Sequence, residues 1–550
     1  MQNRFKQGER GRNSVVRRLS LAVYKGKSVK LISALLLVAV FVGAVSNGFA
    51  FEPYIGHGYD WFWDTYPIQN GYHVERVVTS NELGLVTAMS NPRDMLVHES
   101  STGEVYIFIV DSDNSRILVT DENFENVREM KDFIYCDNYK VQNFLGAGNQ
   151  RNEEAYWEEV RRIGTKTTLN GPTGIFVTEV RGEIALYIAD HFNERVVACD
   201  LDGNIWMEFR RPVTETFDSD TSFRPLKVIV DNAANVYVCL TNITRGAVVF
   251  DSYGNFRGYF GANRVTKTGA AVLNSFLRLV LSDEAMAQRN TPAPVEFSNF
   301  TIDKDQFIYT VTETRSAGID IVKKLNPAGQ NVFENMGRDD WLWGAPMQPF
   351  VFGKTYMSMI TDITVTDIGD IFLLDRESGQ IYHYDKEGSL MFIFGGKGNQ
   401  KGLFNLPTAI ETYGNKVYVL DSAKSSITVF KLTEFGQLVV DAMALFNSGQ
   451  YVESIKPWEE VLKRDANYYM AYIGMGNAKL SLGEFAEALD FFYMHSYSGY
   501  DRAFKDFRIN YIRENFDKML VVTVAGIIML MGGYYGVKYY RRYRAKAKEI

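Results

Sequence analysis

One short pattern of strands and turns recurs along the sequence between Pro92 and Phe430. Its clearest copy begins at Phe392 and contains a glycine-rich turn, a strand after Pro407, a Gly-Asn turn, a second apolar strand that ends at Asp421, and a third strand. Strand-forming runs of four to eight residues between Gly, Asn and Asp turns are typical of antiparallel sheets. Copies of this length predict small sheets repeated around a ring, as in a β-propeller.

The pattern occurs six times, which predicts six blades. The copies begin near Pro92, Pro172, Pro225, Ser298, Thr361 and Phe392. The strand Tyr72–Thr79 precedes the first copy and can supply a fourth strand to the last one, which closes the ring and covers both free sheet edges. Insertions at 137–170 and 262–294 interrupt the ring, and long inserts in a repeat array often lie on a binding face.

Four copies carry related residues at the turn after their second strand. These residues are Asp111, Asn114 and Arg116; Asp190, Asn193 and Arg195; and Asp375 and Asp421, where the Asn and Arg are missing. They resemble the Asp-x-x-Asn-x-Arg-Ile/Val motif of NHL-repeat β-propellers. Asp and Asn are turn formers, and Arg can bridge carboxylates or carbonyls of neighbouring strands. We therefore expect these residues to stabilise the scaffold.

A second repeat follows the ring. Gly449 and Gly483 are 34 residues apart, and each separates two apolar helical stretches. Small and aromatic residues recur around them, namely Gly449, Tyr451, Gly476, Gly483, Phe485 and Ala488. This pattern resembles the tetratricopeptide (TPR) repeat, of which two copies and a closing helix at 501–518 fit the chain. The resemblance implies an all-α module that binds partner proteins.

Two uncharged segments near the ends of the chain predict contact with a membrane. Leu31–Ala50 is long enough to cross a bilayer and also has the features of a signal peptide, with Gly48–Ala50 as a cleavage site. Met519–Val537 is followed by tyrosines and arginines, as expected for a membrane helix with a cytoplasmic anchor.

The charges of the chain set its expected orientation. Residues 1–30 contain nine Lys and Arg against one acidic residue, and 538–550 contain six against one, although the whole chain has a net charge of −7. The positive-inside rule places both basic ends in the cytoplasm and the acidic residues 51–517 outside it. An acidic bulk makes nucleic acid a poor partner.

These signals together predict a mainly β propeller, then an all-α TPR-like module, between terminal membrane segments. The expected parts are a basic tip (1–30), a signal peptide or membrane helix (31–50), an aromatic linker (51–71), the propeller (72–433), the helical repeats (438–517), a membrane helix (519–537) and a basic tail (538–550).

The sequence offers no recurring set of catalytic residues. Three cysteines are too few for a disulfide framework, and the six histidines fall at different places in the repeats. No nucleophile elbow, zinc-protease helix or P-loop is present. We therefore expect neither catalysis nor a cofactor. The alternative is a sugar lactonase or lyase that holds a divalent cation on the ring axis, as some related propellers do.

An aromatic pair beside carboxylates is the strongest candidate for a ligand site. Trp341 and Trp343 follow Asp339 and Asp340 between two copies of the repeat. Aromatic faces and carboxylates can hold sugar rings by stacking and hydrogen bonds. A structural plug fits the same residues equally well.

The expected function is binding and assembly outside the cytoplasm. Bacterial proteins that combine an NHL propeller with terminal membrane segments resemble accessories of carbohydrate uptake systems, which implies a membrane transport complex as partner. A glycan receptor remains a further alternative.

Overall fold

The computed structural model describes residues 52–59, 65–135, 166–180, 182–214, 217, 221–262, 298–313, 321–333, 358–495 and 497–546. Every element below belongs to one compact unit, Tyr54–Ile550. The segment 31–50, most of the two insertions (137–165 and 263–294), and the candidate ligand residues Asp339, Asp340, Trp341 and Trp343 lie outside the described residues.

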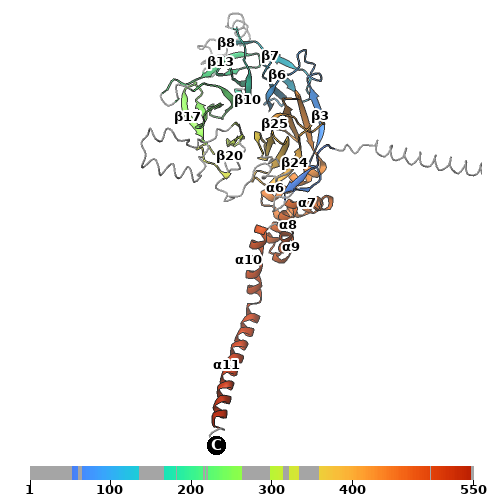
Figure 1. The fold of residues 1–550 in the computed structure, drawn as a ribbon, viewed down its shortest axis with the longest axis vertical. Coiled ribbons are helices and arrows are strands. Elements are labelled where there is room, and N and C mark those ends of the chain that lie inside the picture. Colours follow the sequence, from blue (N-terminus) through green and yellow to red (C-terminus); the bar gives the residue numbers. More distant parts are fainter. Residues whose placement is uncertain are drawn as a thin grey trace, which may run out of the picture. The chain divides into compact units, whose positions relative to one another are not determined.

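Six small sheets form a six-bladed β-propeller, and Figure 1 shows them around a common axis. Within each sheet, neighbouring strands of the repeat are antiparallel and follow one another in the sequence. The first strands of adjacent blades contact each other around the ring, in the order β4, β10, β14, β18, β21, β25 and back to β4. These inner strands therefore line the axis. The prediction of a six-bladed, mainly β ring is confirmed.

The blades are numbered here in chain order. Blade 1 contains β4 (Pro92–Glu99), β5 (Val105–Asp111), β6 (Arg116–Asp121) and β7 (Arg128–Met130). Blade 2 contains β10 (Pro172–Val180), β11 (Glu183–Asp190), β12 (Arg195–Cys199) and β13 (Asn204–Arg210). Blade 3 contains β14 (Pro225–Val230), β15 (Val236–Leu240), β16 (Gly246–Phe250) and β17 (Phe256–Gly261).

The second half of the ring repeats this plan. The described strands of blade 4 are β18 (Asn299–Ile302), β19 (Ile308–Val311) and β20 (Val322–Leu325). Blade 5 contains β21 (Ile360–Val365), β22 (Ile371–Asp375), β23 (Gln380–Tyr384) and β24 (Leu390–Gly395). Blade 6 contains β25 (Pro407–Tyr413), β26 (Lys416–Asp421), β27 (Ser426–Leu432) and, from the start of the ring, β3 (Tyr72–Thr79).

Blade 6 closes the ring as the sequence predicts. Strand β3 pairs antiparallel with β27 along its whole length, from Tyr72 opposite Leu432 to Thr79 opposite Ser426. Residues from the two ends of the propeller thus share one sheet, which leaves no free edge at the junction.

Short strands extend two of the blades outward. In blade 5, β1 (His57–Tyr59) pairs with β24 and with β2 (Thr65–Pro67). In blade 2, β8 (Phe133–Tyr135) pairs with β13 and with β9 (Lys166–Thr167). Part of the segment 51–71, which the sequence assigns to a linker, therefore belongs to the propeller sheet.

A chain of helices follows blade 6. The helices are α6 (Glu434–Asn447), α7 (Tyr451–Arg464), α8 (Tyr469–Ser481), α9 (Phe485–His495), α10 (Tyr497–Glu514) and α11 (Phe516–Lys546). From α6 to α10 each helix packs against the next one in the sequence. Thr433 caps the N-terminus of α6, because its side chain accepts a hydrogen bond from the Gly436 amide, and its own amide donates to Gly71 in the propeller.

The propeller and the first helices share one hydrophobic core. Phe435 of α6, Trp458 of α7 and Tyr468 before α8 are buried against Phe392 and Met391 of blade 5. The Tyr468 hydroxyl donates to the backbone carbonyl of Met391 at 3.0 Å. The two parts are therefore one packed body.

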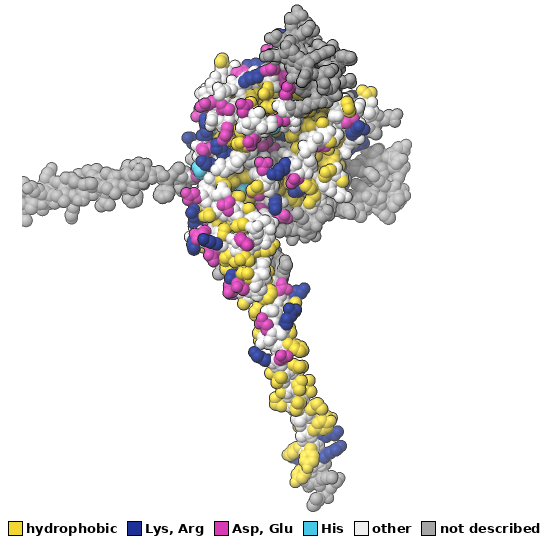
Figure 2. All heavy atoms as spheres, turned by 180° about the vertical axis from the view of Figure 1, so that it is seen from behind, with side chains coloured by type: hydrophobic (Ala, Val, Ile, Leu, Met, Phe, Trp, Pro, Cys, Tyr) yellow, Lys and Arg dark blue, Asp and Glu magenta, His cyan; other side chains and the backbone are white. Residues whose placement is uncertain are grey.

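Helix α11 has the length and composition of a membrane-spanning helix. Residues 516–544 pass this test, and none of the apolar window is buried within the protein. In Figure 2 hydrophobic side chains cover much of the surface of this helix, and Lys and Arg side chains gather toward its end. The segment predicted from the sequence, Met519–Val537, lies inside it.

Candidate functional site

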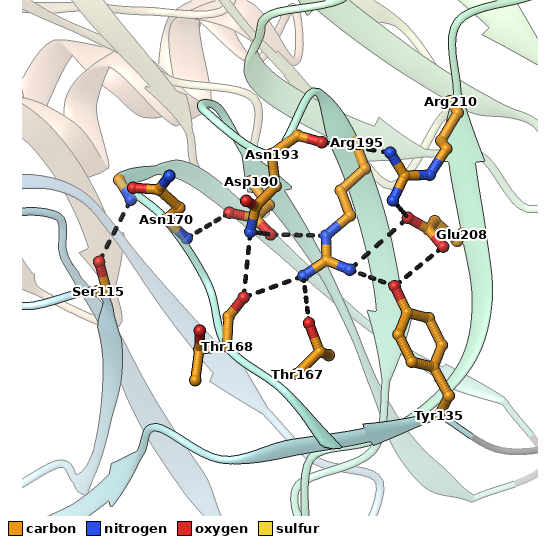
Figure 3. A network of polar contacts seen from close by, with 11 residues as sticks. Ser115, Tyr135, Thr167, Thr168, Asn170, Asp190, Asn193, Arg195, Glu208 and Arg210 are labelled. Atoms are coloured by element: carbon orange, nitrogen blue, oxygen red, sulfur yellow. Dashed lines mark hydrogen bonds and ion pairs between the residues drawn. The ribbon is translucent and has the colours of Figure 1, made fainter. Parts of the chain in front are cut away.

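The motif residues of the blades form networks that hold the turns in place. Asp190 ends β11, is fully buried, and accepts hydrogen bonds from the Asn170 amide at 2.7 Å, from Asn193 Nδ2 at 2.8 Å and from Arg195 Nε at 2.7 Å (Figure 3). Arg195 also donates to the Thr168 carbonyl at 3.1 Å and to the Tyr135 hydroxyl. One carboxylate therefore connects the turn, the preceding loop and the arginine.

The same arrangement recurs in blade 1. Asp111 accepts from the Ser90 amide, Asn114 Nδ2 and Arg116 Nε, and the Arg116 guanidinium also pairs with Glu129 at 2.9 Å. In the motifs without Asn and Arg, backbone amides supply most of the donors: Met359, Glu377 and Ser378 for Asp375, and Asn405, Leu406, Ala423 and Lys424 for Asp421. The Ser358 hydroxyl also donates to Asp375 at 2.8 Å. All four aspartates are fully buried.

The helical residues singled out in the sequence lie at turns and helix contacts. Gly449 and Gly483 follow α6 and α8 with φ angles of 77° and 76°, a conformation that favours glycine. The Tyr451 ring contacts Phe446, Phe485 begins α9, and Ala488 is fully buried. A Cβ on Gly476 would lie 2.6 Å from the Phe492 ring, so α8 and α9 approach closely there.

A second set of residues, not singled out by the sequence, lines the propeller axis. In five blades the inner strand has a β-bulge next to its first residue, and the residue after the bulge is Asp94, Gly174, Lys227, Asp362 or Ala409. Asn299, at the start of β18, is the corresponding residue of blade 4. Asp94, Lys227, Asn299 and Asp362 are called the axial cluster below.

The axial cluster joins blades across and around the ring. Lys227 Nζ of blade 3 donates to Oδ1 and Oδ2 of Asp94 in blade 1 at 2.6 and 2.7 Å. Blade 2 lies between them, and its corresponding residue is Gly174, where a Cβ would stand 2.5 Å from the Leu226 carbonyl oxygen. Asp94 also accepts the amide of Ile175 in blade 2 at 2.8 Å.

Asp362 has the same role on the other side of the axis. It accepts Asn299 Nδ2 of blade 4 at 2.7 Å and the Ile410 amide of blade 6 at 2.7 Å. Burial raises the pKa of Asp362, and the charge of Lys227 limits the rise. Burial also opposes the charge of Lys227, but the surrounding carboxylates, Asp94 first, raise its pKa above the ordinary value.

A cavity of about 780 Å³ opens at one end of the axis, beyond the axial cluster. The later residues of the inner strands line it, including His98, Phe176, Thr301, Thr364 and Glu411. Leu432 at the end of β27 and Val440 of α6 line it as well. The propeller and the helical region therefore share the wall of one cavity.

Four titratable groups that line this cavity have displaced pKa values. Burial raises the pKa of the Tyr72 and Tyr413 hydroxyls, and the other two groups are Glu411 and His98. Burial, with the charges of Asp362 and Asp94, raises the pKa of Glu411 to about 8, although Lys227 opposes this. Its Oε2 accepts the Thr364 hydroxyl at 3.1 Å. Burial lowers the pKa of His98, whose Nε2 lies 3.7 Å from a Glu179 carboxylate oxygen. At neutral pH the cavity thus holds a protonated acid and a neutral imidazole.

A chain of polar groups lies at the side of the cavity nearest α6. The Tyr72 hydroxyl is 3.1 Å from His383 Nδ1, and His383 Nε2 is 3.2 Å from Asp370 Oδ2. Because the carboxylate can only accept when ionised, Nε2 carries the proton and Nδ1 accepts from Tyr72. The imidazole stacks on Phe372 with ring centroids 4.0 Å apart. His383 and Tyr72 are buried, and this packing fixes the chain in place.

The geometry also tests whether a divalent cation fits the axis. Within the described ranges no group of three or more His, Cys, Asp or Glu side chains is arranged to hold a metal ion. Lys227 Nζ is bonded to Asp94, and both oxygens of that carboxylate already accept from it. The described axial residues therefore do not fit the metal centre of the enzyme alternative.

Comparisons with known proteins assign no family and no function to this chain. No family model and no curated protein matches the sequence. Virginiamycin B lyase from Staphylococcus aureus is 12% identical over 66% of this chain and 100% of its own, with a TM-score of 0.36. PorZ, a surface component of the type-IX secretion system of Porphyromonas gingivalis, is 13% identical over 60% of this chain and 40% of its own, with a TM-score of 0.30.

Proposed function

We propose that this protein is a membrane-attached binding and assembly protein on the outer side of the membrane. In this proposal the ring is an NHL-type propeller and the helices form a TPR-like module. Together they hold a partner protein that belongs to a carbohydrate transport system of the same membrane.

The shared core of the propeller and helices carries the proposal. Phe435, Trp458 and Tyr468 connect α6, α7 and the start of α8 to blade 5, so the two parts form a single rigid surface for a partner. The helices then continue into α11, which has the length and composition to enter the membrane. A rigid body beside a membrane helix suits assembly with a membrane complex.

The axial cluster also favours binding over catalysis. Lys227 and Asp94 bond to each other, and Asp94 also accepts the amide of Ile175 in blade 2. Asp362 accepts hydrogen bonds from the Asn299 side chain and from the Ile410 amide of neighbouring blades. Such groups stabilise the ring, whereas a catalytic group needs a free face toward a substrate.

Site-directed photocrosslinking of the full-length chain in its own membrane tests the proposal. Photoreactive residues placed at Val452, Leu482 and Tyr493, which are exposed positions of the helical region, should capture one reproducible membrane protein. Val86 and Val213 are exposed positions on the propeller outside the cavity and serve as comparisons. If no position yields a reproducible partner, the assembly function is wrong.

A second candidate is an enzyme that acts on a sugar lactone or uronate in the cavity. Glu411 and His98 favour it, because a protonated carboxyl and a neutral imidazole in one cavity can serve as general acid and general base. Turnover of a lactone or uronate by the purified chain, abolished in both His98→Ala and Glu411→Gln, would support this candidate. Turnover that survives both changes would exclude these roles.

A further inference from the structure

We infer that the cavity at the end of the propeller axis binds an uncharged, hydroxyl-rich ligand of the size of a mono- or disaccharide. This inference rests on the proposed binding function and specifies the ligand of the cavity. The volume of about 780 Å³ lies within the range of small-molecule sites, roughly 300–1,000 Å³.

The wall of the cavity combines apolar surface with hydroxyl groups. Phe176 and Tyr413 contribute half-buried aromatic surface, and Thr301, Thr364 and Thr412 contribute hydroxyls. Apolar faces beside a few fixed polar groups suit ligands with both C–H faces and hydroxyls, such as sugars.

The charges of the wall disfavour an anion. Four carboxyl groups line the cavity, those of Glu99, Asp367, Asp370 and Glu411. The one Lys or Arg among the described lining residues is Lys416, and it is paired with Glu122 at 2.8 Å. A phosphate or carboxylate ligand would therefore meet like charges and no free cation.

Glu411 supplies a hydrogen-bond donor instead of a negative charge. The groups that face it are Lys227 of β14, Asp362 and Thr364 of β21, and Asp94 of β4. Lys227 is already bound to Asp94, and the two aspartates disfavour a third negative charge beside them. The carboxyl of Glu411 thus keeps its proton at neutral pH and can donate it to a ligand hydroxyl. Protonated Glu411 gives no advantage to a cationic ligand, and of the other carboxylates of the wall Asp370 is bonded to His383 and Glu99 to Tyr413.

Calorimetric titration of the full-length chain in lipid nanodiscs tests the ligand class. Nanodiscs are needed because glycosidic detergents would compete for the site. A panel of neutral mono- and disaccharides is screened, and the best binder is compared with its uronic acid and its amino sugar. We expect the neutral sugar to bind at least ten-fold more tightly than either charged form. Failure of every neutral sugar, or preference for a charged form, overturns the inference.

Substitutions then locate the site. Ile368 is exposed and lines the cavity, so Ile368→Trp should lower the affinity at least ten-fold without disturbing the core, whereas Val86→Trp at an exposed site elsewhere should not. Equal affinities of these two variants overturn the assignment to this cavity.

The pH dependence identifies the donor. Wild-type affinity should fall as pH rises from 7 to 9, because Glu411 loses its proton there, and Glu411→Gln should bind equally well at both values because it keeps a donor and an acceptor. A wild-type affinity that does not change with pH excludes Glu411 as the donor. Crosslinking to a partner together with failure of all sugars would leave the assembly function standing and remove only the ligand assignment.

Discussion

Lys227 and Asp94 lie in blades that are not neighbours, yet the ammonium group of Lys227 bonds both carboxylate oxygens of Asp94. The corresponding residue of the intervening blade is Gly174, and any larger residue there would collide with the backbone of Leu226. The pair therefore crosses the ring and ties blade 1 to blade 3. On the other side of the axis Asp362 is held by neutral donors, the Asn299 side chain and the Ile410 amide, so the centre of the ring is filled by hydrogen-bonded polar groups.

Breaking this pair should destabilise the ring. Asp94→Asn leaves the buried charge of Lys227 without its partner, and removal of one member of a buried ion pair costs about 3–5 kcal/mol of unfolding free energy. Urea denaturation of the detergent-solubilised chain measures the change. As a matched control, Lys463→Met breaks an exposed pair with Glu460 and should leave the denaturation midpoint unchanged. Equal midpoints for Asp94→Asn and the wild type would show that the pair is not a structural tie.

The motif arginines offer a test of their structural role. Arg195→Lys keeps the charge but cannot reproduce the bonds of the guanidinium to Asp190, Thr168 and Tyr135, so it should lower the unfolding free energy by about 2–3 kcal/mol. Arg210 lies beside it in Figure 3 and is more than half exposed. Arg210→Lys should therefore have no effect on the thermal midpoint, and an equal loss in both variants would contradict the assignment.

The sequence predicts the ring well because its signals are local. Each of these signals is visible within a few residues of the sequence. They are the periodicity of the strands, the aspartates that end the second strands, and the extra strand Tyr72–Thr79 before the first repeat. The membrane segment at Met519–Val537 is likewise a local feature of composition, and α11 contains it.

The axial cluster could not be predicted in the same way. Its members differ in type from blade to blade, and comparison of the histidines alone finds no recurring position. The available signal was the residue two places after the proline that opens a blade, as in Pro92-Arg-Asp94 and Pro225-Leu-Lys227. Even so, the contact between Asp94 and Lys227 exists only when the ring is closed. The raised pKa of Glu411 likewise depends on burial in the folded ring and on charges from other blades.

The close approach of α8 and α9 tests the packing of the helical module. Gly476→Ala places a Cβ against the buried Phe492 ring, and such overpacking costs about 1–3 kcal/mol. Gly449→Asn should be tolerated, since its surroundings are open and Asn accepts a left-handed conformation. Scanning calorimetry of both variants checks the difference. A Gly476→Ala protein with a wild-type transition would contradict the helix contact.

The raised pKa of Glu411 has a consequence for stability as well as for ligand binding. The folded chain holds this proton up to a pH of about 8, whereas the unfolded chain releases it near its ordinary value of 4.5. The stabilisation that Glu411 gives to the folded chain is therefore fully present below pH 4.5 and is lost as pH rises toward 8. The unfolding free energy of the wild type should fall over this interval more steeply than that of Glu411→Gln. Identical slopes from urea titrations at pH 5, 6.5 and 8 would show that Glu411 ionises normally.

The proposed orientation in the membrane can be tested with single cysteines. Val213→Cys adds a thiol at a fully exposed site of the propeller, and Tyr543→Cys adds one at the basic end of α11. A membrane-impermeant maleimide applied to intact cells should label the first, and the second only after permeabilisation, because the basic end is expected in the cytoplasm. Cys136→Ala is included in every variant, and the chain with this change alone provides the background, since Cys199 and Cys239 are buried. Labelling of Tyr543→Cys without permeabilisation would place the basic end outside, and protection of Val213→Cys would place the propeller in the cytoplasm.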